Sequence, residues 1–504
     1  MSVFETVNAV LTSAVAVVNE YIWYLAFIML GCMGLYFTWK TKGVQLSMLK
    51  ESCRLSFHGM KASDVLGGKN AVSSFQAFCV SMGARVGVGN ISGVGMAFIM
   101  GGPGAIFWMW VFALIGAATS FVECTIGQIY KEKGADGLFH GGPAYYIKNA
   151  LGKGKFAIFV ALLVIITYPI CFTQVQANTI TDAFVTAFNI DPLIMAVIVT
   201  VISAIVILGG IARVARVSSW VVPIMAVAYL IIALIVIAMN FTKIPEMFSV
   251  ILGCAFGFQQ IGGAALGTAI IWGVKRGAFS NEAGIGSIPN VTSAAKVKHP
   301  ARQGLMQSIG VLIDTLVVCS ATAFMVMLLG DYTQYVAAAG GPDNISGVAL
   351  VQNMLMQESI LGSAAPIIIA VFILVFAFSS MIGYYSMGEA NTRFITQNKT
   401  VIWIFRIVVI AMIFVACIAN FALVWAMADV FMAVMRLVNL GALIFIGKHA
   451  FEALADYKKQ RAAGIDDPVF DPSVLSSQKG ISCWPDKDDY SPLGDHPFFD
   501  CQVG

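Results

Sequence analysis

The sequence predicts an all-α integral membrane protein, and three observations carry that prediction. Hydrophobic residues make up 59% of the 504 positions and charged residues only 11%, with a mean hydropathy of +0.83. The apolar residues fall in long segments, and about 20 of them suffice for a helix to cross a bilayer. Basic residues gather in every second connection between these segments. Ordinary soluble proteins do not combine these properties.

Eleven apolar segments are long enough to be transmembrane helices. Helices are expected because a chain in lipid must satisfy its own backbone hydrogen bonds. The predicted spans are residues 19–38, 71–100, 104–131, 156–188, 192–212, 216–240, 248–274, 303–330, 364–392, 401–420 and 422–447. An odd number of spans places the two termini on opposite sides of the membrane.

The positions of Lys and Arg predict the orientation of the chain. Residues 1–39 contain neither, whereas the next connection contains Lys40, Lys42, Lys50, Arg54, Lys61 and Lys69. Basic connections stay in the cytoplasm, so the N-terminus is expected outside a plasma (inner) membrane and the C-terminus inside. The later basic connections are Lys131 to Lys155, Arg213 to Arg216, Lys275 to Arg302, Arg393 to Lys399 and Lys448 to Arg461, and the others contain only Lys243.

Several other classes of protein lack support in the sequence. No basic region precedes the first apolar segment, so it is not expected to be a cleaved signal. A net charge of +3 does not argue for nucleic acid, and the ten cysteines show no metal-ligand spacing or disulfide framework. The motifs HExxH, GxSxG and the P-loop are missing, so we do not expect an enzyme. Residues 456–504 are polar and are expected to form a solvated cytoplasmic tail.

A glycine-rich interruption lies inside the second predicted span. Residues 83–95 read GARVGVGNISGVG and contain five glycines. Glycine at this density weakens a helix, and a broken helix at membrane depth is tolerated where its freed backbone groups meet protein, water or a ligand. The segment is therefore a candidate binding site of a transporter.

The ten spans after the first divide into two sets of five with opposite topology. The second set opens with residues 248–274, in which residues 253–267 read GCAFGFQQIGGAALG and again contain five glycines. Paired interruptions at corresponding positions of inverted repeats indicate a binding site at the membrane midplane. The alternative is that these small residues only allow close helix packing.

Five motifs together resemble the alanine/glycine:cation symporter family. They are GARVGVGNISGV at 83–94, GGPGAIFWMWVFALIG at 101–116, GGPAYYI at 141–147, QAN at 176–178 and WGVKRGAFSNEAGIGS at 272–287. The likeness runs from about residue 20 to 460. It implies a leucine-transporter-type fold with two inverted five-helix repeats, at 71–247 and 248–447. An extra N-terminal helix within residues 1–70 and a tail at 448–504 flank them.

The same resemblance implies the function and part of the site. Such transporters couple the inward movement of alanine, glycine or sometimes glutamine to Na⁺ by alternating access. The segment GARVGVGN at 83–90 is similar to the unwound first helix of neurotransmitter:sodium symporters. That likeness assigns the substrate carboxylate to the amides of Gly87, Val88 and Gly89. It assigns the cation to the carbonyls of Gly83, Val86 and Phe376 and the hydroxyls of Ser379 and Ser380.

Further residues are expected near the substrate. Phe256, Phe258, Gln259, Gln260, Gly262 and Gly263 accompany the second glycine-rich stretch, and Gln176 and Asn178 lie on the fourth predicted span. Asn90 either bonds across the first interruption or touches the substrate. Helix packing is the alternative role for the amides at 176 and 178.

Four charged residues within the predicted spans are functional suspects or helix-to-helix ties: Arg85, Glu123, Asp314 and Asp429. Arg85 is expected to be paired or in water, and its positive charge favours one cation per substrate. Proton coupling through Glu123 or Asp314 is an alternative to sodium, and a glycine-lined channel is the rival class. We expect a small neutral amino acid, Na⁺ and the lipid bilayer as partners, without another cofactor or an obligatory protein partner.

Overall fold

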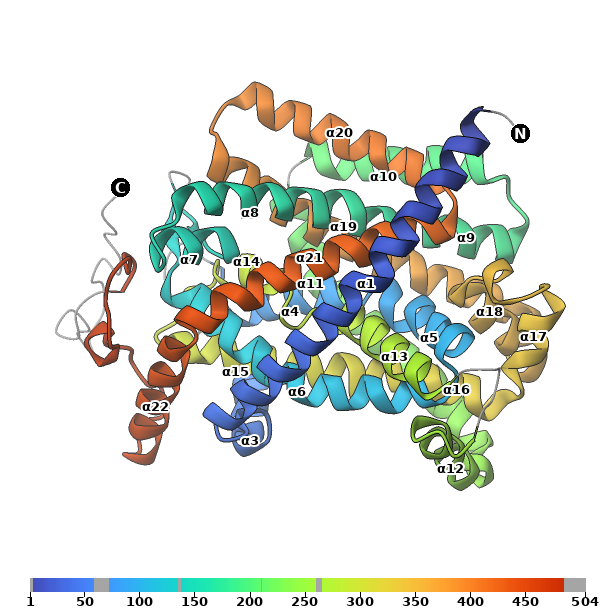
Figure 1. The fold of residues 1–504 in the computed structure, drawn as a ribbon, viewed down its shortest axis with the longest axis horizontal. Coiled ribbons are helices and arrows are strands. Elements are labelled where there is room, and N and C mark those ends of the chain that lie inside the picture. The colour runs from blue at the N-terminus through green and yellow to red at the C-terminus, as the bar shows by residue number, and fades with distance from the viewer. Residues whose placement is uncertain (1–2, 59–71, 135–136, 210, 260–264, 485–504) are drawn as a thin grey trace.

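The computed structural model describes residues 3–58, 72–134, 137–209, 211–259 and 265–484. Long helices run side by side along the longest axis of the molecule (Figure 1). Nearly every regular element in these residues is helical. The exception is a short hairpin of two antiparallel two-residue strands, in which Glu132 pairs with His140 and Lys133 with Phe139. The predicted all-helical fold is therefore confirmed.

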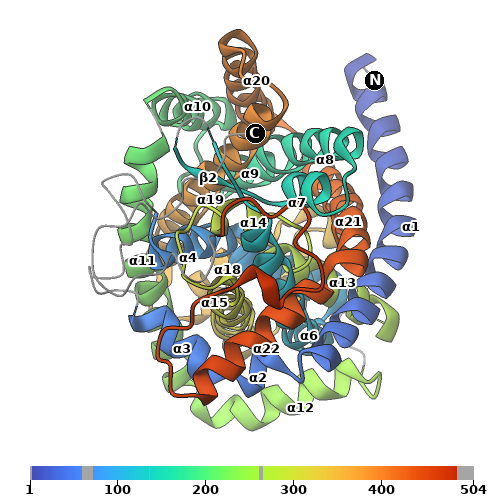
Figure 2. The same cartoon turned by 90° about the vertical axis from the view of Figure 1, so that its left-hand side faces the viewer.

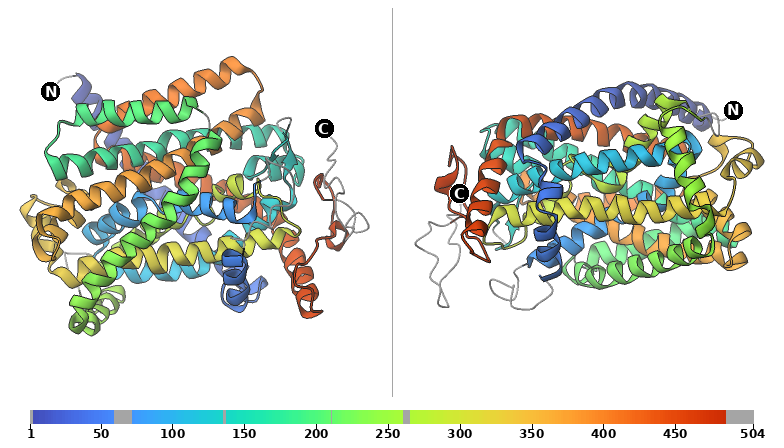
Figure 3. Two further views of the ribbon diagram at one scale, coloured as in Figure 1. Left: turned by 180° about the vertical axis from the view of Figure 1, so that it is seen from behind. Right: turned by 90° about the horizontal axis from the view of Figure 1, so that it is seen from below.

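The elements up to residue 239 are α1 (Val3–Lys40), α2 (Val44–Ser47), α3 (Leu49–His58), α4 (Ser74–Arg85), η2 (Gly89–Gly93), α5 (Val94–Gly101), α6 (Gly104–Ile129), β1 (Glu132–Lys133), β2 (Phe139–His140), α7 (Pro143–Asn149), α8 (Gly154–Ile166), η3 (Thr167–Phe172), α9 (Thr173–Phe188), α10 (Pro192–Gly209) and α11 (Ile211–Met239). On the face seen from behind, α11 crosses the bundle diagonally (Figure 3). It packs there across α4, α16 and α19.

The later elements are η4 (Phe241–Lys243), α12 (Ile244–Ala255), α13 (Leu266–Asn281), α14 (Ile288–Thr292), α15 (Pro300–Leu312), η5 (Ile313–Cys319), α16 (Ser320–Leu329), α17 (Tyr332–Ala338), η6 (Pro342–Asn344), α18 (Gly347–Glu358), η7 (Gly362–Ala364), α19 (Ala365–Ile395), α20 (Lys399–Ile418), α21 (Phe421–Ile446), α22 (Lys448–Ala462) and η8 (Pro472–Val474). Three of the elements, η2, η3 and η5, are π-helical turns inside longer helices. Such turns occur frequently at functional sites.

Seven helical segments of the described chain are long and apolar enough to cross a membrane. They coincide with seven of the eleven predicted spans. A pair bent by 77° between residues 223 and 255 would be an eighth, and Gly89–Gly101 and Pro192–Leu208 are shorter apolar helices. The predicted count of eleven therefore stays a prediction, since the remaining segments are broken, bent or short.

Connections of alternate helices gather at opposite ends of the bundle. The end that faces the viewer in Figure 2 carries α3, α7 and α22, while α17, α18 and the N-terminus lie at the other end in Figure 1. The basic connections at α3, α7 and α22 thus share one end, while the orientation in the membrane stays a prediction. Two of the predicted basic connections need correction, and in the first of them Arg213 and Arg216 lie within helix α11. Lys275 and Arg276, counted above as part of a basic connection, are buried within α13 and face Asp429 of α21.

Helix α6 is the central scaffold, and glycines let its neighbours approach its backbone. It packs against α1, α13 and α15. A Cβ on Gly273 would clash with the Ala105 carbonyl oxygen, and one on Gly304 would lie 2.7 Å from that of Phe121. Small residues at these crossings allow the close packing on which membrane helices depend.

Candidate functional site

The predicted interruption in residues 83–95 is present. Helix α4 begins with a capping box between Ser73 and Gln76 and ends at Arg85, and Val86 has extended backbone angles. The chain re-enters a helix through the π turn η2 before α5. We call Val86–Val88 the first break. Its freed amides are buried and have side-chain partners, because an unpaired buried N–H is costly.

Two side-chain oxygens accept hydrogen bonds from the first break. The N–H of Gly87 donates to Oδ1 of Asn90 at 2.9 Å, and the N–H of Val88 donates to Oε1 of Gln176 at 3.3 Å. Asn90 thus bonds across the break, one of its two expected roles. Gln176 extends from α9 to the predicted carboxylate site.

The serine pair of α19 lies against the end of α4. Ser380 Oγ is 2.9 Å from the Gly83 carbonyl oxygen and 3.1 Å from that of Phe376. Ser379 Oγ is 3.3 Å and 2.8 Å from the same two oxygens. Four of the five residues predicted around the cation are therefore brought together. The fifth predicted residue, Val86, lies three residues after Gly83 at the C-cap of α4.

An aromatic wall, not anticipated from the sequence, closes the side of the first break that faces α13. The rings of Phe172 and Trp425 each lie 4.9 Å from the ring of Phe279 between them. A Cβ on Gly89 would be 3.0 Å from the Ser280 Cα and 3.2 Å from the Phe279 ring. Only glycine fits at residue 89 without displacing this wall.

The described residues of the predicted second glycine-rich stretch do not join this site. Phe256 and Phe258 are 48% and 84% exposed, and the Phe256 ring packs against Phe107 and Trp108 of α6. The N–H of Gln259 donates to the Gly253 carbonyl in the turn after α12. Gln260, Gly262 and Gly263 lie outside the described residues. Residues 253–259 therefore form a turn after α12 and lie apart from the first break, while the role predicted for Gln260, Gly262 and Gly263 stays a prediction.

The interruption that meets the first break lies instead at Glu282–Ser287, which we call the second break. Helix α13 ends at Asn281 and α14 begins at Ile288. Between them, Glu282, Gly284 and Gly286 have positive φ angles of 55°, 76° and 80°. Left-handed backbone is natural for the two glycines and needs support at Glu282.

A buried carboxylate supplies part of this support. Glu123 of α6 accepts from the N–H of Gly284 through Oε1 and from that of Gly286 through Oε2, both at 3.2 Å. Asn439 of α21 donates to Glu123 Oε2 and to the Gly284 carbonyl, each at 3.0 Å. Glu123 therefore holds the second break in the way that a bound carboxylate would hold freed amides.

Two buried arginines bind the carbonyls of the same region. Arg85 Nε donates to the Asn281 carbonyl at 2.8 Å, and Arg436 donates to those of Ala278 at 3.1 Å and Ala283 at 3.4 Å. A guanidinium at the end of α13 is favoured by the negative pole of the helix. Arg85 is thus paired with neutral oxygens, which also include Oε1 of Gln307 at 2.8 Å.

The other charged suspects tie helices together. Asp314 of η5 accepts from Asn90 Nδ2 at 2.7 Å and from Ser280 Oγ at 2.8 Å. Asp429 forms an ion pair with Arg276, and Asn178 Nδ2 donates to the Ala416 and Ala419 carbonyls. The predicted alternative of helix packing therefore describes the contacts of Asn178 and Asp429.

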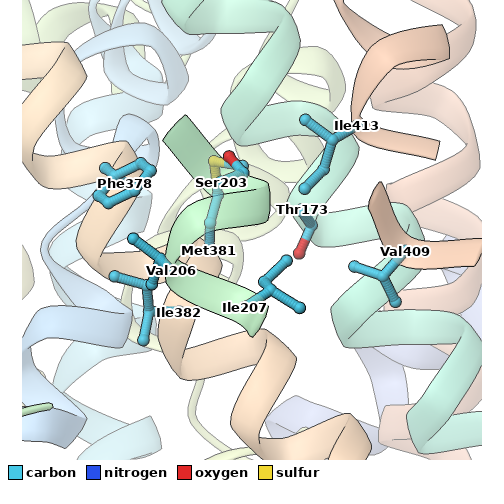
Figure 4. A pocket seen from close by; sticks show the side chains of 9 residues that line it. All are labelled: Thr173, Ser203, Val206, Ile207, Phe378, Met381, Ile382, Val409 and Ile413. Atoms are coloured by element: carbon cyan, nitrogen blue, oxygen red, sulfur yellow. The ribbon is translucent and has the colours of Figure 1, made fainter. Parts of the chain in front are cut away.

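A small apolar pocket lies beside α19 and is separate from these contacts. Figure 4 shows side chains from α9, α10, α19 and α20 surrounding it, with few polar atoms among them. Its lining residues are Thr173, Ser203, Val206, Ile207, Phe378, Met381, Ile382, Val409 and Ile413. None of the predicted site residues lines this pocket.

Comparisons with known proteins find relatives of similar sequence and a solved structure of similar fold. A Bacillus subtilis protein described as probable sodium/glutamine symporter GlnT is 44% identical over 480 residues, covering 95% of this chain and 97% of that protein. A second B. subtilis protein, described as putative sodium/proton-dependent alanine carrier protein YrbD, is 38% identical over 92% of this chain and 95% of its own length. A solved manganese transporter variant from Eremococcus coleocola shares the fold, with a TM-score of 0.53 at 14% identity over 82% of this chain and 93% of its own.

The family itself is shown by a direct match. The model of the sodium:alanine symporter family matches residues 8–472. The resemblance inferred from the five sequence motifs is therefore confirmed, as is the expectation of a transporter and not an enzyme. With its interrupted helices, its buried oxygen cluster and this match, the chain belongs to the sodium:alanine symporter family.

Proposed function

We propose that this protein carries small neutral amino acids into the cell by sodium-coupled symport, with the first break as the shared binding site. The observation that carries the proposal is the cluster of neutral oxygens from Gly83, Phe376, Ser379 and Ser380 beside the amides of Gly87 and Val88. A cation site and a carboxylate site thus meet within one unwound segment.

The oxygen cluster suits Na⁺ by its chemistry. Sodium is a hard cation that prefers several oxygen ligands, and carbonyls and hydroxyls supply them without a second buried charge. The carbonyl of Val86 would complete a set of five. Because the ligands come from α4 and α19, a bound ion would link the first break to a helix from the other half of the chain.

The amides of Gly87, Val88 and Gly89 would hold the substrate carboxylate. The contacts of Asn90 Oδ1 and Gln176 Oε1 with the first two amides support this role, because each amide oxygen stands where a carboxylate oxygen would accept the same hydrogen bond. The wall of Phe172, Phe279 and Trp425 would limit the substrate side chain. Alanine and glycine fit this proposal best, with D-alanine and glutamine as further candidates.

Transport would proceed by alternating access in a leucine-transporter-type fold of eleven spans. The inverted repeats would comprise residues 71–247 and 248–447, with α13 and α14 as the interrupted helix of the second repeat. The extra helix of residues 1–70 would place the N-terminus outside and the 448–504 tail in the cytoplasm. Na⁺ would order the first break, the amino acid would complete the site, and the repeats would rock around it.

Uptake into proteoliposomes tests this function. Purified protein would be given labelled alanine under an inward Na⁺ gradient, an inward H⁺ gradient or no gradient, with glycine, D-alanine and glutamine as competitors. We expect concentrative uptake with Na⁺ alone, which the competitors reduce according to their affinity. The absence of uptake of any of these amino acids would refute the proposed substrate class.

Proton coupling is the second candidate, favoured by the name of the YrbD relative. Asp314, which bonds both Asn90 and Ser280 beside the first break, would be the proton-carrying group in that case. Uptake driven by H⁺ alone would support this alternative and reject the serine pair as the coupling site. Unitary currents without saturation would instead indicate a channel.

A further inference from the structure

The Ser380 hydroxyl has a single proton, but three backbone carbonyls lie within hydrogen-bond distance of it. Its oxygen lies 2.9 Å from the Gly83 carbonyl, 3.1 Å from that of Phe376 and 3.3 Å from that of Ala84. When a serine hydroxyl gives a lone pair to a cation, its single proton must point to another acceptor. Two of these three carbonyls are proposed ligands of the same ion. Ala84 is therefore the acceptor that leaves the ligand set intact.

The Ala84 carbonyl is also reached by a second hydroxyl. Tyr384, one helical turn after Ser380 on α19, places its Oη 3.1 Å from the Ala84 oxygen and 2.6 Å from Oε1 of Glu282. A phenol likewise carries one proton, which an ionised carboxylate attracts more strongly than a carbonyl does. While Tyr384 donates to Glu282, the Ala84 carbonyl remains free to accept from Ser380.

Glu282 is the first residue of the second break, and its neighbours in the chain are bound by cationic side chains. It is fully buried, and its backbone is held at a φ of 55°. The carbonyls on either side of it, those of Asn281 and Ala283, accept hydrogen bonds from Arg85 and Arg436. Two guanidinium groups thus flank the residue, and both stay protonated.

We propose that Glu282 and Tyr384 are positioning residues for the cation site. Through Tyr384, the second break determines whether the Ala84 carbonyl is available to the Ser380 proton, and hence how well Ser380 binds Na⁺. By reciprocity, bound Na⁺ favours the position of the Glu282 side chain in which it accepts from Tyr384. This inference rests on the proposed sodium symport and adds the connection between its two breaks.

A double-mutant cycle tests the connection. In Glu282→Gln, a neutral amide attracts the Tyr384 proton less than a carboxylate does, so more of that proton goes to Ala84 and competes with Ser380. The Na⁺ concentration for half-maximal alanine uptake should rise about three- to tenfold, the effect of one hydrogen bond. The alanine KM at saturating Na⁺ should change by less than about twofold.

Removal of the intermediary should abolish this effect. In Tyr384→Phe no phenol proton competes for Ala84, so adding Glu282→Gln should shift half-activation by less than about twofold. The matched control is Tyr168→Phe, since the Tyr168 hydroxyl donates to the Ile285 carbonyl of the same break at 2.9 Å without contact to Ala84. Adding Tyr168→Phe should leave the half-activating Na⁺ concentration unchanged, both in the wild type and in Glu282→Gln.

The cycle has clear contrary outcomes. An equal shift by Glu282→Gln with and without Tyr384 would overturn the relay through the phenol, and no shift in either background would overturn the role of Glu282. If Glu282→Gln does not fold, Glu282→Asp shortens the side chain but keeps its charge, and the same rise is expected. Stabilisation of the purified protein against heat by Na⁺ gives a second readout that is independent of transport.

The failure of this inference can be told apart from failure of the proposed function. Wild-type protein without sodium activation would refute the function, and the inference would fall with it. Normal sodium activation of the wild type together with an additive double mutant would refute only the connection between the breaks. A coupling that disappears with Tyr384→Phe supports both.

Discussion

The two breaks of this molecule lie side by side but are held by opposite chemistry. At the first break, neutral groups accept from the freed amides and donate to the freed carbonyls: Asn90, Gln176 and the serine pair. At the second break, the charged Glu123, Arg85 and Arg436 bind the backbone. Charge-assisted hydrogen bonds are stronger and more directional than neutral ones.

This difference indicates that the two breaks have different roles. Neutral partners can be replaced by a carboxylate or a cation at small cost, so the first break can exchange them for ligands. Buried charged partners cannot be withdrawn without leaving an uncompensated charge. The second break is therefore a fixed support, which reaches the cation site through Glu282 and Tyr384.

The largest effect should come from removing the anion of the second break. Glu123→Ala would leave the amides of Gly284 and Gly286 without their acceptor and reduce the negative charge near two arginines. We expect a loss of roughly 3–5 kcal/mol in stability, and therefore little folded protein. Yield and size-exclusion profiles of the detergent-solubilised variant measure this. A well-folded Glu123→Ala with normal uptake would contradict the role of a fixed support.

A comparable loss, but of function alone, is expected at the first break. Gly89→Val would force a β-branched side chain against Ser280 and Phe279 and into the proposed carboxylate site, which should abolish alanine uptake. Gly93→Ala is the matched control in the same π turn, because a Cβ there meets no atom closer than 3.9 Å. Substantial uptake by Gly89→Val would reject the proposed carboxylate site.

A smaller effect should separate two amides on one helix. Gln176→Ala removes the acceptor that the substrate carboxylate would displace from the Val88 N–H, so it should lower the alanine KM about three- to tenfold, with sodium activation nearly unchanged. Asn178→Ala removes the hydrogen bonds to α20 and should lower thermal stability without changing KM. If both variants behaved alike in KM and stability, the assignment of Gln176 to the site and Asn178 to packing would be wrong.

The smallest effect lies away from both breaks, where Glu51 of α3 joins α22. Burial alone would raise the pKa of Glu51, but hydrogen bonds from Arg54 at 2.6 Å and Tyr457 at 2.7 Å outweigh it and hold the pKa below 4.5. A lowered carboxyl pKa stabilises the fold above about pH 4.5, and the gain disappears as the pH falls through the folded pKa.

Thermal unfolding of wild type and Glu51→Gln at several pH values checks this contribution. The wild type should be more stable at pH 7 by about 1 kcal/mol or less, and the difference should vanish at pH values well below the folded pKa. A difference that persists unchanged in acid would show that the charge of Glu51 is not its cause.

The first break could be predicted from the sequence, whereas the second could not. Glycine density and an apolar context mark residues 83–95 directly. The likeness to known symporters then predicted Ser379 and Ser380 as cation ligands. The second break carries Glu282 and follows Lys275 and Arg276, which hydropathy treats as loop residues. In the structure these three side chains are buried, with the acid and the bases compensated by partners far apart in sequence. Such compensation depends on tertiary packing.

The glycine pattern at 253–267 marks a different feature in the part that the structure describes. Glycines there include Gly253, which accommodates the turn after α12, and Gly257, which has a positive φ of 77°. The same composition thus describes a turn outside the site and a break within it. The aromatic wall was missed because Phe172, Phe279 and Trp425 come from three distant helices without a shared motif.

Sodium activation of Ser380→Ala tests the central claim most directly. Ser386→Ala is the matched control, since Ser386 lies on the same helix and its Oγ donates to the Gly383 carbonyl at 2.7 Å. Loss of one of five oxygen ligands should raise the half-activating Na⁺ concentration of Ser380→Ala about tenfold or more, equivalent to ~1.4 kcal/mol of cation binding. Ser386→Ala should match the wild type. Unchanged sodium activation in Ser380→Ala would contradict the assignment of the first break as the sodium site.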